Sequence, residues 1–414
     1  MREIAILVGV SLDKSTSLDY ELKELESLCE ACEIEVVDKV TQNLSVINTA
    51  TYIGKGKVSE LRELISYHNA DCVVFNDELT PSQISNLESV LDCAIYDRTY
   101  CILEIFKRRS TTKEAYLQVE IARLEYFLPR LSGLRKGLSR IGGGGKTRGS
   151  GETQLELDRR HITNKIVALK NELEEVKKVR STQRERRNKN KVKVVSLVGY
   201  TNSGKSSTLN ALLKYSTLPK KEVMEKDMLF ATLETSTRSI KLKNNHHFLL
   251  TDTLGFVEKL PHHLVEAFKS TLEEITESDL ILHVVDASNP NFSRQIKTTN
   301  DVLSSIGVTD IKMIYLFNKI DKVEDYLYIP EEYPNSIRIS AKEATNLDYL
   351  ISKIEKEIFD DVYVKVLLPF SKGDILSILK ENYNVTKLDY VSEGILVEAY
   401  VDHHMKSLLD TYII

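Results

Sequence analysis

A chain of 414 residues is too long for a single hydrophobic core, so its length indicates two to four domains. Hydrophobic residues make up 42% and charged residues 28% of the chain, which excludes a disordered or fibrous protein. The net charge is only −5, but residues 105–190 carry 22 Lys and Arg against 10 Asp and Glu, which predicts a local contact with a polyanion.

The cellular setting is indicated by two absences in the sequence. The five cysteines form no disulfide framework, and Cys29-x-x-Cys32 has no second pair that would complete a metal site. No apolar run approaches the length of a membrane-spanning helix, and the short apolar stretch after the first residues is not a signal peptide. We therefore expect a cytoplasmic protein without stable membrane insertion.

The first part of the chain, residues 1–107, alternates strands and helices. Apolar β-branched runs at residues 4–8, 34–37, 72–75 and 94–96 predict strands, and helices are expected at 17–31, at 58–67 and from Pro81. This alternation is typical of an α/β domain with a parallel sheet. Gly54-Lys55-Gly56-Lys57 precedes a helix, but we interpret it as a loop with solvated lysines because the rest of a nucleotide site is missing.

Residues 108–190 predict an antiparallel helical hairpin with a basic, glycine-rich loop. Leu117, Ile121, Leu124 and Leu128 form one apolar stripe, and Ile162, Ile166, Leu169, Leu173 and Val176 form a heptad seam. The connection between them holds Arg135, Lys136, Arg140, Lys146 and Arg148 among many glycines. A solvated linker would explain it, but we favour a flexible finger whose arginines and lysines contact nucleic acid.

A phosphate-binding loop opens the next domain, residues 191–360. It follows a predicted strand at 192–198, precedes a predicted helix at 207–213, and reads Gly199-Tyr200-Thr201-Asn202-Ser203-Gly204-Lys205-Ser206. The two glycines allow successive backbone N–H groups to converge on phosphate oxygens, with the positive end of the helix dipole behind them. Lys205 places a cation at the terminal phosphates, and Ser206 offers a hydroxyl to Mg²⁺.

Two further motifs predict contacts to Mg²⁺ and to the γ-phosphate. Thr232, within Phe230-Ala231-Thr232-Leu233-Glu234, can bring a second hydroxyl to Mg²⁺, although Thr235 and Thr237 are rivals for that role. A strand at 248–250 leads into Asp252-Thr253-Leu254-Gly255, where Asp252 would hold the ion through water and the Gly255 N–H would contact the γ-phosphate. The predicted metal ligands are Ser206 and Thr232, and the predicted catalytic residues are Lys205, Thr232 and Gly255.

The last two motifs predict a guanine base. A strand at 313–317 is followed by Asn318-Lys319-Ile320-Asp321, and the Asp321 carboxylate can accept both guanine N1–H and N2–H₂, a donor pair that adenine lacks. Ser340-Ala341-Lys342 follows a strand at 336–339 and can buttress the base. Five motifs in this order favour a GTP-hydrolysing enzyme with Mg²⁺ as cofactor.

Phe256 follows Gly255 at the position where small GTPases of the Ras type carry the glutamine that orients the attacking water. A phenyl ring cannot hydrogen-bond that water, so intrinsic hydrolysis should be slow until a partner, a reordered switch segment or a cation positions the water. Asn202 is a candidate helper for K⁺.

Residues 361–414 predict a small C-terminal α/β domain, with strands at 362–369 and 394–401 and a helix at 374–381. Paired histidines at 246–247, 262–263 and 403–404 lack carboxylate partners at metal spacing, so we interpret them as structural or solvated.

Beyond these motifs, the chain resembles the HflX family of ribosome-associated GTPases, within the Obg-HflX-like superfamily, over most of its length. The residues that carry the resemblance are Asp97-Arg98-Thr99, Leu117-Gln118-Val119-Glu120-Ile121-Ala122, Thr147-Arg148-Gly149-Ser150-Gly151-Glu152-Thr153-Gln154-Leu155-Glu156, Asp158-Arg159-Arg160, Phe230-Ala231-Thr232-Leu233 and Asp252-Thr253-Leu254-Gly255-Phe256. Two positions depart from the family pattern: Ser150 stands where a proline is common, and Glu234-Thr235-Ser236 replaces an Asp-Pro-Thr-like run.

The resemblance implies a multidomain α/β protein with an N-terminal domain, a helical hairpin, a P-loop GTPase domain and a small C-terminal domain. It also implies binding to the large (50S) ribosomal subunit, with the hairpin loop at 23S rRNA near the peptidyl transferase centre, and splitting or rescue of stalled ribosomes. Two alternatives remain open, a ribosome-assembly GTPase and an RNA-remodelling module in which the nucleotide is mainly structural. We expect a monomer when the protein is free.

Overall fold

The structure is a computed structural model that describes residues 2–12, 18–131, 151–189, 192–218, 230, 235–261, 264, 268–323 and 328–414, with side chains except at 151–155, 179–189 and 269–271. Its internal contacts form two compact units. The first comprises residues 1–182, 228–233 and 259–269, and the second comprises residues 183–227, 234–258 and 270–414. Among the described residues, no helix combines the length and the apolar character that crossing a bilayer requires.

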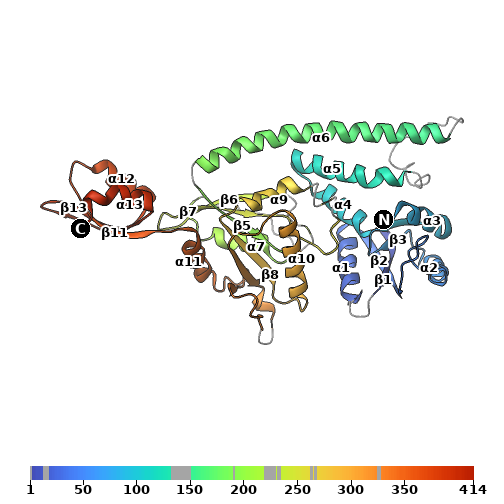
Figure 1. The fold of residues 1–414 in the computed structure, drawn as a ribbon. Helices are drawn as coiled ribbons and strands as arrows, with labels where there is room; N and C mark the ends of the chain where they lie inside the picture. Colours follow the sequence, from blue (N-terminus) through green and yellow to red (C-terminus); the bar gives the residue numbers. More distant parts are fainter. Residues whose placement is uncertain are drawn as a thin grey trace. The chain divides into compact units, whose positions relative to one another are not determined.

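The first unit is built on a four-stranded, fully parallel sheet in the order β2-β1-β3-β4 (Figure 1). Ile6, Val8 and Val73 pack against Leu61 and Leu87 of the helices on one face, α2 and α3, while α1 and α4 lie on the other. This confirms the α/β fold expected for the start of the chain. The strands are β1 (Glu3–Ser11), β2 (Ile34–Asn43), β3 (Cys72–Phe75) and β4 (Ala94–Asp97), and the helices are α1 (Leu18–Ala31), α2 (Lys55–His68), α3 (Pro81–Leu91) and α4 (Arg98–Arg109).

Helix α4 was not predicted, and its start depends on the buried carboxylate of Asp97. One oxygen of Asp97 accepts the Tyr100 N–H at 2.9 Å and the Tyr126 hydroxyl at 2.8 Å, and the other accepts the Leu79 N–H at 3.1 Å. Asp97 is therefore the N-cap of α4 and also connects that helix to two other segments of the unit.

The helical hairpin is formed by α5 (Lys113–Phe127) and α6 (Gly151–Lys189), with a short 3₁₀ turn, η1 (Leu128–Arg130), after α5. Leu117 and Ile121 pack against Leu173, with Leu169 and Val176 beside them, which confirms the predicted seam. Ion pairs Lys113–Glu172 and Lys165–Glu120 run along the same pair of helices. The basic loop at 132–150 lies outside the described residues.

Two short segments from later in the chain complete the first unit. The rings of Phe230 and Phe268 pack edge-on against Phe106, with centroids 4.7 and 4.9 Å away. Lys259 donates to Glu21 at 2.6 Å and to Asp77 at 2.5 Å. These apolar and charged contacts hold the two segments within the unit.

The second unit contains a six-stranded sheet in the order β10-β9-β8-β5-β7-β6, parallel except for β6. Leu209 of α7 and Leu350 of α11 pack against Leu197 and Leu316 on one face, and Ile296 of α10 packs on the other. This is the predicted P-loop GTPase fold. Its strands are β5 (Lys193–Val198), β6 (Ser236–Lys241), β7 (His247–Asp252), β8 (Leu280–Asp286), β9 (Met313–Asn318) and β10 (Ser336–Arg338), and its helices are α7 (Lys205–Leu213), α9 (Lys269–Thr276), α10 (Phe292–Ser305), the 3₁₀ turn η3 (Ile320–Lys322) and α11 (Leu347–Ile358).

A three-stranded antiparallel sheet, in the order β11-β13-β12, ends the chain. Val366 and Val397 pack against Leu379 and Met405 of the two helices. Strands β11 and β13 and helix α12 were predicted, while β12 and α13 were not. The elements are β11 (Val362–Leu368), α12 (Gly373–Asn382), β12 (Asn384–Val391), β13 (Gly394–Val401), α13 (His403–Leu409) and the 3₁₀ turn η4 (Asp410–Tyr412).

His246, in the turn between β6 and β7, links the two sheets of the second unit. Its ring nitrogens lie 2.5 Å from Glu355 and 2.5 Å from Asp361, and its ring stacks on Phe359 at 4.1 Å. Burial alone would lower the pKa of His246, but hydrogen bonds to the Asp361 and Glu355 carboxylates raise it to about 9. The neighbouring Asn245 donates to the Lys380 carbonyl at 3.1 Å, so this turn fastens the C-terminal sheet to the larger one.

Candidate nucleotide-binding site

The loop between β5 and α7 requires glycine at both ends. Gly199 has φ +145° and Gly204 has φ +95°, angles that side-chain-bearing residues rarely adopt. A Cβ added at Gly199 would lie 2.2 Å from the Val284 carbonyl oxygen, and one at Gly204 would lie 2.2 Å from Asn318 Nδ2. The glycines therefore let the loop pass close to β8 and β9, as its predicted role in binding phosphate requires.

Lys205, the first residue of α7, is only 6% exposed. Its ammonium group donates to the Tyr200 carbonyl at 2.8 Å and to the Gly199 carbonyl at 3.2 Å, so the loop's own backbone orients it. Burial lowers the pKa of Lys205 to about 8, an effect that Asp252 opposes and Lys319 adds to. A bound phosphate would stabilise the charged form and restore an ordinary pKa.

Ser206 and Asp252 present oxygen atoms of the kind Mg²⁺ prefers. The Ser206 hydroxyl donates to Asp252 Oδ2 at 2.6 Å, and Asp252 is fully buried at the end of β7. A hydroxyl and a carboxylate at the phosphate end of the loop fit a magnesium ion. Thr232 lies outside the described residues, while its rival Thr237 lies in β6, where its hydroxyl is 3.1 Å from that of Thr251.

Asn318, at the end of β9, joins two loops of the site. Its amide nitrogen donates to the Ser203 carbonyl at 3.0 Å, and its amide oxygen accepts the Ala341 N–H at 3.0 Å. The side chain is 2% exposed, so both bonds are shielded from water. Asn318 thereby brings the phosphate-binding loop and the Ser340-Ala341-Lys342 loop together, as the motif order predicts.

Asp321 lies beside that second loop with its carboxylate exposed. The Ser340 hydroxyl donates to Asp321 Oδ1 at 2.6 Å and accepts the Glu343 N–H at 3.0 Å. The serine thus orients the carboxylate predicted to read guanine. Lys342, next to it, is exposed.

Asp286, which the sequence reading missed, orients Lys319. The Lys319 ammonium donates to Asp286 Oδ2 at 2.8 Å and to the Asn202 carbonyl at 2.7 Å. Both side chains of the pair are less than one-fifth exposed. An acidic residue directly after the apolar run of β8 was the available signal, because parallel strands end at the same edge of a sheet.

Gly255 lies directly on the phosphate-binding loop. A Cβ at this position would be 2.8 Å from Thr201 Cα and 3.0 Å from the Lys205 ammonium nitrogen. The preceding Thr253 donates its hydroxyl to the Leu197 carbonyl at 2.7 Å, and Leu254 is buried. The structure therefore brings Gly255 next to Lys205, as the predicted role at the γ-phosphate requires.

Phe256 is fully buried, so the side chain that stands in place of the water-orienting glutamine is turned into the protein. In the predicted segment from Phe230 to Glu234, only Phe230 is described, because residues 231–234 lie outside the described residues. The Phe256 side chain therefore cannot orient the attacking water.

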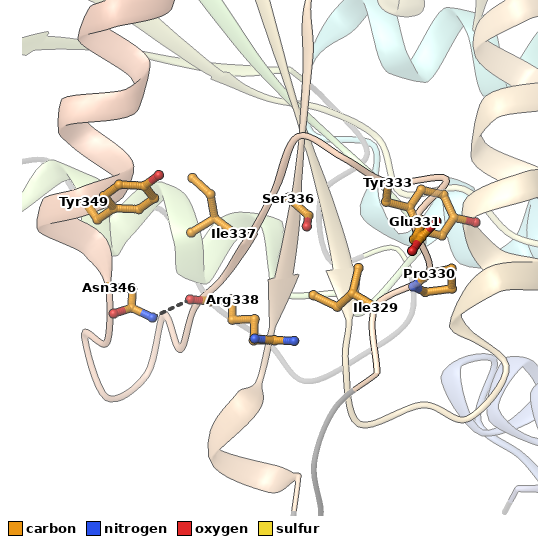
Figure 2. A pocket seen from close by; sticks show the side chains of 9 residues that line it. All are labelled: Ile329, Pro330, Glu331, Tyr333, Ser336, Ile337, Arg338, Asn346 and Tyr349. Carbon is orange, nitrogen blue, oxygen red and sulfur yellow. Dashed lines mark hydrogen bonds between the residues drawn. The ribbon is translucent and has the colours of Figure 1, made fainter.

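A pocket of about 490 Å³ opens beside the edge strand β10. Figure 2 shows that it lies between Tyr349 of α11 and the side chains of Ile329, Pro330, Glu331 and Tyr333. Near Tyr349, the Asn346 amide donates to the Arg338 carbonyl at 2.8 Å. None of the predicted nucleotide-binding residues lines it. The pocket is thus separate from the site built by the motif loops.

Three family models match successive parts of the chain. A GTP-binding GTPase N-terminal model matches residues 19–107, and a GTP-binding GTPase middle-region model matches residues 109–187. A model described as a 50S ribosome-binding GTPase matches residues 194–319, which hold the phosphate loop and the start of the guanine motif.

Curated relatives match nearly the whole chain. The GTPase HflX of Caldanaerobacter subterraneus subsp. tengcongensis is 46% identical over all of this chain and 94% of its own length. The GTPase HflX of Escherichia coli K12 is 36% identical over 91% of this chain and 88% of its own length. A solved structure of a GTP-binding protein from the archaeon Sulfolobus solfataricus in complex with GDP is 24% identical, with a TM-score of 0.44 over 86% of this chain and 99% of that chain.

With the P-loop fold in place and full-length relatives of this similarity, the chain is a hydrolase that converts GTP to GDP, and it belongs to the HflX family of GTPases.

Proposed function

We propose that this GTPase binds the large (50S) ribosomal subunit through its basic hairpin loop and splits or rescues stalled ribosomes. The observation that carries the proposal is the match of residues 194–319 to a model described as a 50S ribosome-binding GTPase. The excess of Lys and Arg over Asp and Glu in residues 105–190 supports contact with rRNA, because neutralising phosphates is the main source of nucleic-acid affinity.

The phosphate end of the site would be formed by Gly199 to Ser206. In this proposal Lys205 neutralises the terminal phosphates, Ser206 and Thr232 ligate Mg²⁺, Asp252 holds it through water, and the Gly255 N–H contacts the γ-phosphate. The ion would supply charge neutralisation at the phosphates. The hydrogen bond between Ser206 and Asp252 supports this assignment, since it already gathers two of the oxygen donors.

Guanine would be recognised by Asp321, with Ser340, Ala341 and Lys342 against the base and Asn318, Lys319 and Ile320 supporting them. The hydrogen bonds Ser340–Asp321 and Ala341–Asn318 support a rigid base site. A site built to pair with two donors rejects a base that lacks them. Asn202, whose backbone has φ +59°, is proposed as a helper for K⁺.

Catalysis would depend on the ribosome because Phe256 cannot orient water. We propose that contact of the loop at 132–150 with 23S rRNA near the peptidyl transferase centre reorders the segments around Thr232 and Gly255. The same proposal includes a cytoplasmic location and a monomeric free state. It also divides the chain into four domains, with boundaries at residues 107, 190 and 360. The family-model boundaries near 107 and 187 support the first two divisions.

An assembly GTPase that acts on immature large subunits is the second candidate, because the same basic loop and nucleotide site would serve it. Pelleting the protein with mature and precursor particles in GTP separates the two: preference for precursors favours assembly.

In the same assay we expect Arg148→Ala to weaken subunit binding while nucleotide affinity stays unchanged. Lys205→Ala should lose nucleotide binding, and unchanged subunit affinity for Arg148→Ala would contradict the role given to the loop.

A further inference from the structure

Tyr200, the second residue of the phosphate-binding loop, connects this loop to the segment that follows Gly255. Main-chain bonds form two of the links: the Thr201 N–H donates to the Phe256 carbonyl at 2.7 Å, and the Phe256 N–H donates to the Gly199 carbonyl at 3.2 Å. The third link is a side chain, because the Glu258 N–H donates to the Tyr200 hydroxyl oxygen at 2.8 Å. The two main-chain bonds form an isolated parallel bridge between Tyr200 and Phe256, and the side-chain bond extends it. We call these three bonds the ladder.

The ladder is closed to solvent. Tyr200 is 4% exposed, Glu258 is 6% exposed and Phe256 is fully buried. The Glu258 carboxylate lies 2.5 Å from Arg294 of α10, which anchors the far end of the segment. Because both residues are buried, removing the tyrosine hydroxyl takes an acceptor away from the Glu258 N–H at a place shielded from bulk water, which costs free energy.

The ladder also sets the position of Gly255. Gly255 precedes Phe256, and the space around it is bounded by the Thr201 backbone and the Lys205 ammonium group. A backbone N–H that stabilises charge on a γ-phosphate must be held within a fraction of an ångström of its productive position. The bond from Glu258 to Tyr200 extends this restraint to three residues beyond Gly255.

We infer that Tyr200 is a positioning residue for GTP hydrolysis. Its hydroxyl accepts the Glu258 N–H and thereby holds the segment after Gly255 against the phosphate-binding loop. The inference rests on the proposed contact of the Gly255 N–H with the γ-phosphate; Tyr200 need not touch the nucleotide, since it acts through the backbone of residues 255–258. The buried Phe256 fits this arrangement, because a side chain that anchors the ladder in the core has replaced one that would reach the attacking water.

The test compares Tyr200→Phe with Tyr383→Phe in the full-length protein, by single-turnover and steady-state GTP hydrolysis without ribosomal particles. Tyr383 is the control because its hydroxyl also makes a hydrogen bond, to Asp402 at 3.1 Å, but between α12 and α13, away from the nucleotide-binding loops. We expect Tyr200→Phe to lower kcat about tenfold, the rate equivalent of one buried hydrogen bond. The KM for GTP and the Kd for GDP should stay within about twofold, since the bond bears on the transition state rather than on binding.

Amide hydrogen exchange gives a second measurement, the exchange rate of the Glu258 amide, which reports on the bond to Tyr200 directly. The Glu258 amide should exchange faster in Tyr200→Phe than in wild type, while amides of β5 are unchanged. An unchanged or raised kcat, or a fall in kcat matched by Tyr383→Phe, would overturn the inference. So would a Glu258 amide that loses protection when wild-type protein binds a non-hydrolysable GTP analogue, a measurement that remains decisive if Tyr200→Phe does not fold.

Discussion

Replacing Gly255 by alanine should slow hydrolysis strongly while sparing GDP binding. The added Cβ would lie 2.8 Å from Thr201 Cα, where ordinary contact begins at 3.4 Å, so the backbone must separate by about 0.6 Å. The Thr201 N–H bond to Phe256 joins this main chain to the segment that carries Gly255, so the separation strains that bond as well. The segment carrying Gly255 must therefore move away from Lys205.

The expected size follows from what the moved N–H does. Loss of one preorganised backbone donor to a developing charge lowers kcat by about 100- to 1,000-fold. Overpacking of this kind also costs about 1–3 kcal/mol of stability, which a thermal unfolding scan measures. GDP has no γ-phosphate, so its affinity should change by less than about threefold.

Gly56→Ala is the matched control, because an added Cβ there meets nothing within 4 Å. The assay is single-turnover GTP hydrolysis at saturating protein, with GDP affinity measured by a fluorescent analogue. Hydrolysis by Gly255→Ala at the rate of Gly56→Ala would refute the placement of Gly255 at the γ-phosphate. Equal losses of GDP and GTP affinity would also contradict it.

Three further changes test other parts of the structure. Asp321→Asn should weaken GTP binding by about 100-fold or more, because two charge-assisted bonds to guanine are lost, and an unchanged preference for GTP over ATP in competition would contradict the base assignment. Asp286→Asn should weaken GDP binding about five- to tenfold by freeing Lys319, whereas Asp310→Asn, on the surface beside Thr309, should not; equal affinities would exclude that role. The raised pKa of His246, about 9 against an ordinary 6.5, means that its stabilisation is complete below pH 6.5 and lost as pH rises through 9. The free energy of unfolding should therefore fall between pH 7 and 9.5 more steeply in wild type than in His246→Gln, and parallel curves would contradict the ion pairs.

The sequence predicted those parts of the fold in which local pattern and chemistry agree. Strand β5 and the loop after it combine an apolar run with glycines and a lysine, and the structure confirms them. The seam of α6 was predictable because this helix packs on one side only, against α5, so its apolar residues follow a regular heptad spacing.

Elements buried on several sides, or irregular in register, could not be predicted in the same way. Helix α4 buries seven of its twelve residues, including Arg98. Its apolar residues crowd into the short run from Cys101 to Phe106, and periodicity alone cannot assign so short a run to a helix or a strand. Strand β12 has a register shift between Val385 and Lys387, which breaks the alternation that marks a strand.

Within the candidate site, motif residues were predictable and their supporting partners were not. Asn318 and Asp321 follow a strand in a recognisable order. The bonds Lys319–Asp286 and Glu258–Tyr200 join residues 33 and 58 positions apart. The place of Asp286 at the end of a strand was a signal that it lies at the site, but the local sequence does not say which residues pair. The hydroxyl of Tyr200 is therefore visible as a functional group only in the folded chain.

The most direct measurement is the rate of GTP hydrolysis by the purified protein with and without purified large ribosomal subunits. We expect slow turnover alone, because Phe256 is buried and cannot orient water, and a rise of more than about tenfold when large subunits are added. Rapid turnover by the protein alone, unaffected by large subunits, would contradict a GTPase that depends on the ribosome to complete its catalytic site.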